Sequence, residues 1–286
     1  MTATTAAPMT SRKPRPNYLL SVVAIGASLV IFVVPFIFVL LTAMKSRQES
    51  AELAFSWPTE FHFVQNFVDV IQARDYLLII AFINSTILTV SSVAILVITS
   101  AMVAYVLQRR SSRWNSLVSL LVLSGLIIPP AVVPTIWVLQ RLGLFRTMPG
   151  LILVEVAFGL AFCVLLFRAF IASIPKELDE AAVIDGAGPI RLFFRVIFPL
   201  LRPVMITVIL VQSVAVYNDF VHPLYFLPGE QNATVQLTLY NFNSQFNTQY
   251  NLLFMDILLV TVPPLIMFLF FNRQIVAGMT SGAIKG

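Results

Sequence analysis

Long apolar runs dominate this 286-residue sequence. A helix that crosses the ~30 Å hydrocarbon core of a bilayer needs about 20 apolar residues, because each residue advances it by ~1.5 Å. Only 11% of the residues are charged, whereas about a quarter are charged in a soluble domain. We therefore expect an all-α integral membrane protein with six transmembrane helices. The expected spans are Tyr18–Met44, Leu77–Leu107, Leu117–Leu139, Leu151–Ile171, Val204–Val216 (extended at both ends) and Leu252–Phe271.

The positions of Lys and Arg predict the orientation. Short cytoplasmic segments of membrane proteins carry an excess of these residues. With both termini in the cytoplasm, 13 of the 18 Lys and Arg fall on the cytoplasmic side, so the basic pI needs no nucleic acid partner. This predicts cytoplasmic tails at residues 1–17 and 273–286 around a transmembrane domain at 18–272. The first apolar run lacks a cleavage-site pattern, so we expect it to remain as a membrane anchor.

Two outer segments are long, residues 45–76 and 218–251. Both mix polar and aromatic residues, and each is either a solvated loop or a docking surface for a partner. The sequence contains no Gly-x-x-x-x-Gly-Lys-Ser/Thr phosphate loop. If this protein uses ATP, another chain must therefore hydrolyse it.

The segment at residues 174–199, "IPKELDEAAVIDGAGPIRLFFRVIFP", is too polar to span a membrane and too regularly patterned for a loop. Pro175 suits a first helical position, and the acidic residues that follow favour a helix N-terminus. Gly186 and Gly188 end this helix, and a second begins at Pro189. We call this segment the hairpin. The apolar stripe predicted on its second helix is Ile190, Phe193, Phe194 and Ile197.

Small side chains keep the glycine corner of the hairpin thin. A thin, rigid projection with an acidic end suits a cleft on a partner. The alternative is an amphipathic hairpin lying on lipid headgroups, which anionic lipid would disfavour because the first helix is acidic.

The hairpin resembles the EAA loop of permease subunits of ATP-binding-cassette (ABC) importers. The matching positions are Glu180, Ala181, Ala182, Gly186, Val196, Phe198 and Pro199, with Val196 and Phe198 replacing the family's Ile and Leu. The resemblance covers most of the chain and points to the maltose-type carbohydrate permeases. Further matching stretches are "PFIFVLLTAMK", "NST" at Asn84–Thr86, "IIPPAVVPTIWVLQRLGLF", "YNDFVHPLYF" and "RQIVAGMTSGAIKG".

The resemblance implies a transport subunit of a prokaryotic plasma membrane rather than an enzyme. Its expected partners are a second permease, a cytoplasmic ATPase dimer that holds ATP and Mg, an extracytoplasmic solute-binding protein and a carbohydrate. No cofactor is expected in this chain. Disaccharides, oligosaccharides, polyols and glycerol-phosphate compounds all suit the family. The residues implied to couple to the ATPase are Glu180, Ala181, Ala182, Asp185, Gly186, Ala187 and Gly188.

Polar residues inside spans are functional hypotheses by default. Gln212, Val216 and Asp219 recur at i, i+4 and i+7, and Tyr217 and Asn218 adjoin them. We predict that Gln212, Tyr217, Asn218 and Asp219 line the translocation pathway. Asp219 has an equal alternative as a structural group near the interface, hydrogen-bonded to a neighbouring loop. The family more often has Trp where Tyr217 stands.

Two further carboxylates, Glu155 and Asp256, fall near the outer ends of their spans, where we expect both to reach water. His62 and His222 are isolated in sequence, so no metal site is expected. Three prolines are expected to kink the third span: Pro129, Pro130 and Pro134.

Two other classes compete with the importer subunit. A self-sufficient secondary transporter or channel, acting as a homo-oligomer, needs a coupling-ion site in mid-membrane, and the sequence places no charge pair there. An intramembrane enzyme needs a nucleophile and a base within a span, and no such arrangement is present in the sequence.

Overall fold

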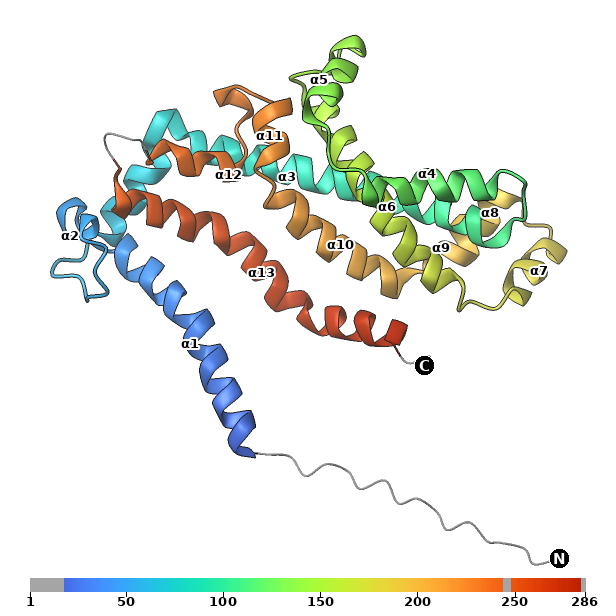
Figure 1. Cartoon of the computed structure of the whole chain (residues 1–286), viewed down its shortest axis with the longest axis horizontal. Coiled ribbons are helices and arrows are strands. Elements are labelled where there is room, and N and C mark those ends of the chain that lie inside the picture. Colours follow the sequence, from blue (N-terminus) through green and yellow to red (C-terminus); the bar gives the residue numbers. More distant parts are fainter. Residues whose placement is uncertain (1–17, 244–247, 284–286) are drawn as a thin grey trace, which may run out of the picture.

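The computed structural model describes residues 18–243 and 248–283, and all regular structure in these ranges is helical (Figure 1). The predicted tail at residues 1–17 and the last three residues of the predicted C-terminal tail lie outside these ranges. The α-helices are α1 (Tyr18–Ala43), α2 (Arg47–Ala51), α3 (Phe63–Arg109), α4 (Asn115–Ile127), α5 (Val132–Arg141), α6 (Met148–Ile171), α7 (Glu177–Ile184), α8 (Pro189–Leu192), α9 (Phe198–Leu200), α10 (Arg202–Tyr217), α11 (Val221–Phe226), α12 (Val235–Thr238) and α13 (Tyr250–Ala283). A π-helix, η1 (Phe193–Ile197), and two 3₁₀ turns, η2 (Glu230–Asn232) and η3 (Leu239–Asn241), complete the described elements.

Among the described residues, four helices are long and apolar enough to cross a membrane: Ser21–Ala43, Phe63–Arg109, Met148–Ile171 and Tyr250–Phe271. A fifth candidate is the pair Pro189–Leu200 and Arg202–Tyr217, which is bent by 77°. These correspond to five of the six predicted spans. Several apolar helices of this length agree with an integral membrane protein.

The predicted third span, Leu117–Leu139, is not one helix. It is divided into α4, of 13 residues, and α5, of 10 residues, by a non-helical stretch at 128–131. The reason is local: Pro129 and Pro130 lack an N–H donor, and each disfavours the helical conformation of the residue before it. The expected kink is therefore a complete interruption of the helix.

The first outer segment contains more helix than predicted. In addition to α2, the first turns of α3 begin at Phe63, well before the predicted start of the span. Helical geometry breaks at Ala73–Tyr76, where Arg74, Asp75 and Tyr76 have φ values of 48°, 54° and 63°. The break separates an outer helical arm from the apolar part of α3. The second outer segment carries α11, η2, α12 and η3.

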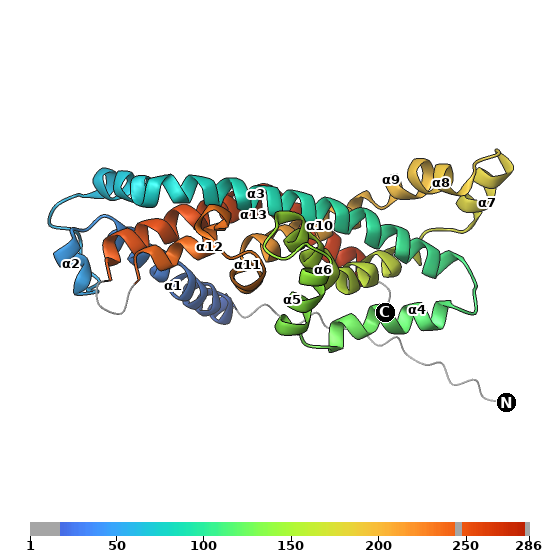
Figure 2. The same cartoon turned by 90° about the horizontal axis from the view of Figure 1, so that it is seen from above.

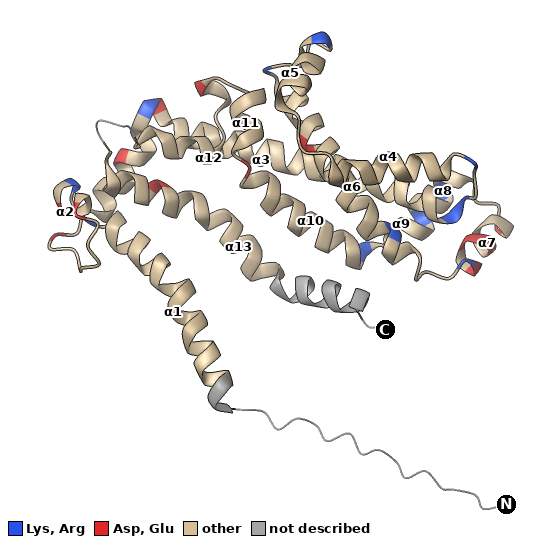
Figure 3. Cartoon of the chain, viewed as in Figure 1, with Lys and Arg blue, Asp and Glu red and all other residues tan. Residues whose placement is uncertain are grey.

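Helix α3 is the central element of the bundle and contacts α6, α10 and α13 (Figures 1 and 2). In Figure 3 many of the charged residues lie near α2 at one end of the molecule and near α7 and α8 at the other, and the long helices between them are largely uncharged. One buried cluster joins α3, α6 and α10 to the hairpin through Phe167, Ile171, Phe193 and Ile197. The hairpin is thus packed onto the end of the bundle. Helix α1 extends away from the bundle, and its apolar window buries no residue within this chain (Figure 1).

Candidate functional site

The hairpin has the predicted form of two short helices around a glycine corner. Helix α7 begins at Glu177, two residues after the predicted start. Gly186 has φ +80°, a conformation that favours glycine. Its N–H donates to the carbonyl of Val183, and the N–H of Ala187 donates to the carbonyl of Ala182. This pair of bonds is a Schellman motif, which ends α7 sharply and satisfies two of its last carbonyls.

A π-helical turn follows α8 and divides the predicted apolar stripe. The N–H of Phe198 donates to the carbonyl of Phe193, five residues earlier, so the wider turn changes which residues share a face. Phe193 and Ile197 are buried against the bundle, whereas Ile190 and Phe194 are exposed. The prediction that all four form one packing face is therefore wrong.

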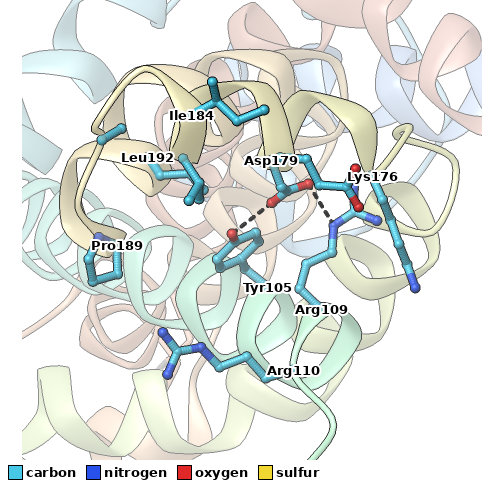
Figure 4. Close-up of a pocket in the computed structure, with 11 residues that line it drawn as sticks. Tyr105, Arg109, Arg110, Lys176, Asp179, Ile184, Pro189 and Leu192 are labelled. Atoms are coloured by element: carbon cyan, nitrogen blue, oxygen red, sulfur yellow. Dashed lines mark hydrogen bonds and ion pairs between the residues drawn. The ribbon is translucent and has the colours of Figure 1, made fainter.

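Asp179 on α7 anchors the hairpin to the end of α3 (Figure 4). Its Oδ1 accepts a hydrogen bond of 2.7 Å from the hydroxyl of Tyr105, and its Oδ2 lies 3.2 Å from Nε of Arg109. The Nε–H is not aligned with the carboxylate, so this second contact is an ion pair rather than a hydrogen bond. Arg109 also donates to the carbonyl of Ile174, at 2.8 Å. Three contacts thus tie the base of the hairpin to α3.

The tip of the hairpin is exposed and partly apolar. Ile184 is 85% exposed and Ile190 75%, on either side of the glycine corner. The side chain of Glu180 is exposed and forms no ion pair or hydrogen bond within the described ranges. Of the other residues implied to couple, Ala182 is buried and Ala187 half-buried, whereas the exposed ones are Ala181, Asp185, Gly186 and Gly188.

A cavity of about 690 Å³ lies where α7 and α8 meet the end of α3 (Figure 4). It is open on one side, and Glu180 and the apolar Ile184 are among its lining residues. Its walls combine basic, acidic and apolar groups: Tyr105, Arg109, Arg110, Lys176, Asp179, Glu180, Val183, Ile184, Ala187, Pro189 and Leu192. The surroundings of the hairpin therefore offer a mixed surface suited to a protein segment.

The four predicted pathway residues do not form one stripe. Gln212 is buried toward α6, where its Oε1 would lie 3.2 Å from a Cβ added at Gly159. Tyr217 is buried and lines a separate cavity between α3, α10 and α13. Asn218 is exposed, and its Oδ1 accepts a hydrogen bond from Gln236. Their role in transport stays a prediction.

The fourth of these residues, Asp219, lies between α10 and α11 and joins two other titratable groups. Its Oδ1 accepts a 2.8 Å hydrogen bond from the N–H of Val221, and its Oδ2 contacts Nδ1 of His222. The same Nδ1 lies 3.1 Å from Oε1 of Glu155 on α6. The alternative of a structural, hydrogen-bonded Asp219 thus matches the observed contacts.

The imidazole of His222 lies between two carboxylates and stacks on Phe158, with ring centroids 4.8 Å apart. Burial opposes its charged form, but hydrogen bonds to Asp219 and Glu155 raise the pKa of His222 to about 9. Burial also raises the pKa of Asp219, but the contacts with His222 outweigh it and lower that pKa overall. One imidazole nitrogen, Nδ1, thus faces two carboxyl groups. The three groups also offer three ligand atoms within 4.8 Å of one another, a cluster that sequence spacing alone did not reveal.

The expectation that Glu155 and Asp256 reach water is wrong. Glu155 is buried, with His222 as its partner, and Asp256 is completely buried within α13. Neither carboxylate oxygen of Asp256 has a hydrogen-bond partner in the described part of the chain. The second outer segment packs at both places: His222 of α11 contacts Glu155, and α12 contacts α13, the helix that carries Asp256.

The comparison with known families decides the identity. Residues 97–280, which include the hairpin, match the family described as "Binding-protein-dependent transport system inner membrane component". The chain belongs to this family. The resemblance to ABC importer permeases is therefore confirmed.

Curated relatives of the permease cover nearly its whole length. It is 34% identical over 260 residues to the diacetylchitobiose uptake system permease protein NgcG of Streptomyces coelicolor, covering 90% of this chain and 85% of that one. It is 33% identical over 257 residues to the melibiose/raffinose/stachyose import permease protein MelC of Bacillus subtilis, covering 88% and 91%.

A solved structure shares the fold of the permease. It is a chain of a bacterial ABC transporter involved in the import of the acidic polysaccharide alginate, with a TM-score of 0.78 and 20% identity. The likeness covers 93% of this permease and 99% of that chain. The arrangement of helices described above is thus that of a known transporter subunit.

Proposed function

We propose that this permease is one of two membrane-spanning subunits of an ATP-driven carbohydrate importer in a prokaryotic plasma membrane. It has six spans and both termini in the cytoplasm, with α4 and α5 together serving as the third span. A separate ATPase dimer hydrolyses ATP with Mg, and an extracytoplasmic binding protein delivers the sugar. The carbohydrates named for the relatives NgcG and MelC support a carbohydrate substrate.

A second solved structure supports the binding-protein partner. It is a bacterial alginate ABC transporter in complex with an alginate pentasaccharide-bound periplasmic protein, with a TM-score of 0.64 and 18% identity. The likeness covers 90% of this chain and 92% of that one. The long outer segments of the present chain are the proposed docking surface for such a protein.

The exposed tip of the hairpin carries the proposal. Ile184 in α7 and Ile190 in α8 are exposed, and these helices lie at an end of the molecule where charged residues gather (Figure 3). Exposed apolar surface of this kind marks contact sites for other proteins. The anchoring of Asp179 to Tyr105 and Arg109 joins the tip to α3, so a displaced hairpin moves α3 with it. Closure of the ATPase dimer would thereby change the tilt of the bundle and switch the direction in which the pathway opens.

The test is purification of the native complex in a mild detergent, with mass identification of every stoichiometric partner. The expected result is a second permease and an ATPase that hydrolyses ATP. Recovery of this chain alone or as a homo-oligomer, with transport activity intact, would contradict the proposal and support a self-sufficient transporter or channel.

A further inference from the structure

A small cavity lies where α3, α10 and α13 meet. Its volume is about 190 Å³, space for roughly six water molecules. Pro263 lies 13 residues after the start of α13, so the cavity is about 20 Å along that helix. This depth places it inside the apolar part of the bundle. The lining residues are Thr86, Thr89, Val90, Ser213, Val214, Tyr217, Pro263, Pro264 and Met267.

Two hydroxyl groups at this cavity have no hydrogen-bond partner in the part of the chain that the structure describes. Thr89 and Tyr217 are each only 8% exposed, and neither Oγ1 of Thr89 nor Oη of Tyr217 is hydrogen-bonded to any described group. Thr86 differs, because its hydroxyl donates to the carbonyl of Phe82, at 2.7 Å. A buried hydroxyl without a partner destabilises a protein, and lipid offers no water to replace it. These two groups therefore require an additional partner.

Helix α13, which forms one side of the cavity, also lacks some of its internal hydrogen bonds there. Pro263 and Pro264 have no N–H, so the carbonyls of Leu259 and Val260 lose their usual donors four residues later. The lining itself supplies four side-chain hydroxyls, those of Thr86, Thr89, Ser213 and Tyr217. No charged side chain is among its nine lining residues, and Val90 and Met267 supply apolar surface. This combination suits a neutral molecule with hydroxyl groups and C–H faces rather than an ion.

We propose that Thr89 and Tyr217, with Ser213 beside them, bind hydroxyl groups of the sugar as it crosses the membrane. This chain would then contact the carbohydrate directly. The alternative is that it only encloses the pathway and that the second permease makes all contacts with the sugar. The inference rests on the proposed function, because it names the substrate contact of the same transporter. Bound water is the competing occupant, and the experiment distinguishes it from sugar.

The experiment measures uptake by the complete transporter in its own membranes, normalised to the amount of assembled complex. The probes are radiolabelled raffinose, trehalose and diacetylchitobiose. The sugar that the wild type transports is then used to compare the variants. The variants Thr89→Val and Tyr217→Phe each remove one hydroxyl with little change in shape. The matched controls are Thr99→Val on the same helix, whose hydroxyl already donates to the carbonyl of Ile95, and the exposed Tyr225→Phe.

Each cavity variant should raise the KM for the sugar by about fivefold, the effect of losing one neutral hydrogen bond. A series of deoxy analogues then locates the contact. For one analogue, the wild type and the variant should have the same KM, because the sugar already lacks the hydroxyl that the removed side-chain group binds.

The outcomes are distinguishable. Unchanged KM values in both cavity variants would overturn the inference while leaving the importer intact. If a variant instead raised the KM by the same factor for every deoxy analogue, the hydroxyls would be assigned to bound water. That result would also overturn the inference. A wild type that carries neither these three sugars nor any member of a wider panel of disaccharides, oligosaccharides and polyols would contradict the proposed carbohydrate substrate itself, and the inference with it.

Discussion

Arg109 and Asp179, 70 positions apart in the sequence, form an ion pair of 3.2 Å that joins the end of α3 to the first helix of the hairpin. Their side chains are only 8% and 17% exposed, so water screens the pair weakly. The hydroxyl of Tyr105 binds the other oxygen of the same carboxylate. The hairpin is therefore held rigidly to the helix at the centre of the bundle.

The variant Asp179→Asn should uncouple transport from ATP hydrolysis. It leaves the largely buried guanidinium of Arg109 without its counter-ion, at a cost of about 1–3 kcal/mol. We expect fewer sugar molecules carried for each ATP hydrolysed, which reconstituted vesicles would measure. The matched control is Glu177→Gln, which removes an exposed charge from the same helix. An unchanged ratio in Asp179→Asn would show that the ion pair does not transmit force.

The variant Gly188→Trp should prevent association with the ATPase without straining this chain. Gly188 has φ −68°, and a Cβ built there meets no atom within 4 Å. The bulky ring would thicken the tip and block entry into a cleft. Gly186→Trp is a less specific test, because φ +80° disfavours any side chain at that position.

Association is measured by the amount of ATPase recovered with the tagged permease. Ser111→Trp, in the exposed connection between α3 and α4, is the control for adding a large apolar surface elsewhere. Normal recovery of the ATPase with Gly188→Trp would refute docking through the glycine corner.

The contact of His222 with its two carboxylates should make stability depend on pH. An imidazole in the unfolded chain has a pKa of about 6.5, and the folded value is higher, about 9. Protonated His222 therefore stabilises the fold fully below pH ~6.5, and this stabilisation is lost as the pH rises through about 9.

The melting temperature of the purified protein should fall between pH 7 and pH 9.5 by more in the wild type than in His222→Gln. The control is His62→Gln, since His62 has a more exposed partner, Glu60, at 3.4 Å. Equal pH dependence in the wild type and His222→Gln would show that the imidazolium contributes nothing to stability.

Gly159 should be required for close packing of α6 on α3. A Cβ there would lie 2.7 Å from Cδ2 of Leu96, which is completely buried and has little freedom to move. We expect Gly159→Ala to destabilise the protein by about 1–3 kcal/mol, measured as a lower melting temperature in detergent. Gly26→Ala on the exposed α1 is the control, because a Cβ at that position meets no atom within 4 Å. Equal melting temperatures for the wild type and Gly159→Ala would show that the close packing of α6 on α3 does not require glycine at this position.

The sequence alone determined the elements that depend on local chemistry. Apolar length predicted the four long spanning helices and the bent fifth, and the glycine and proline positions predicted the corner of the hairpin. These features follow from hydrophobicity, from the φ value that Gly186 adopts and from the missing N–H of proline. The interruption at Pro129 and Pro130 had the same local cause, although its extent was underestimated.

Only the tertiary structure decided which helix faces meet. Glu155 and His222 lie 67 positions apart, Arg109 and Asp179 lie 70 apart, and the cavity with Thr89 and Tyr217 needs three separate helices. A helix that is apolar on every side carries no hydrophobic stripe to show which face is buried, so the pattern of residues does not specify its neighbours. The physical reason is that packing, rather than local hydrophobicity, selects these contacts within a membrane.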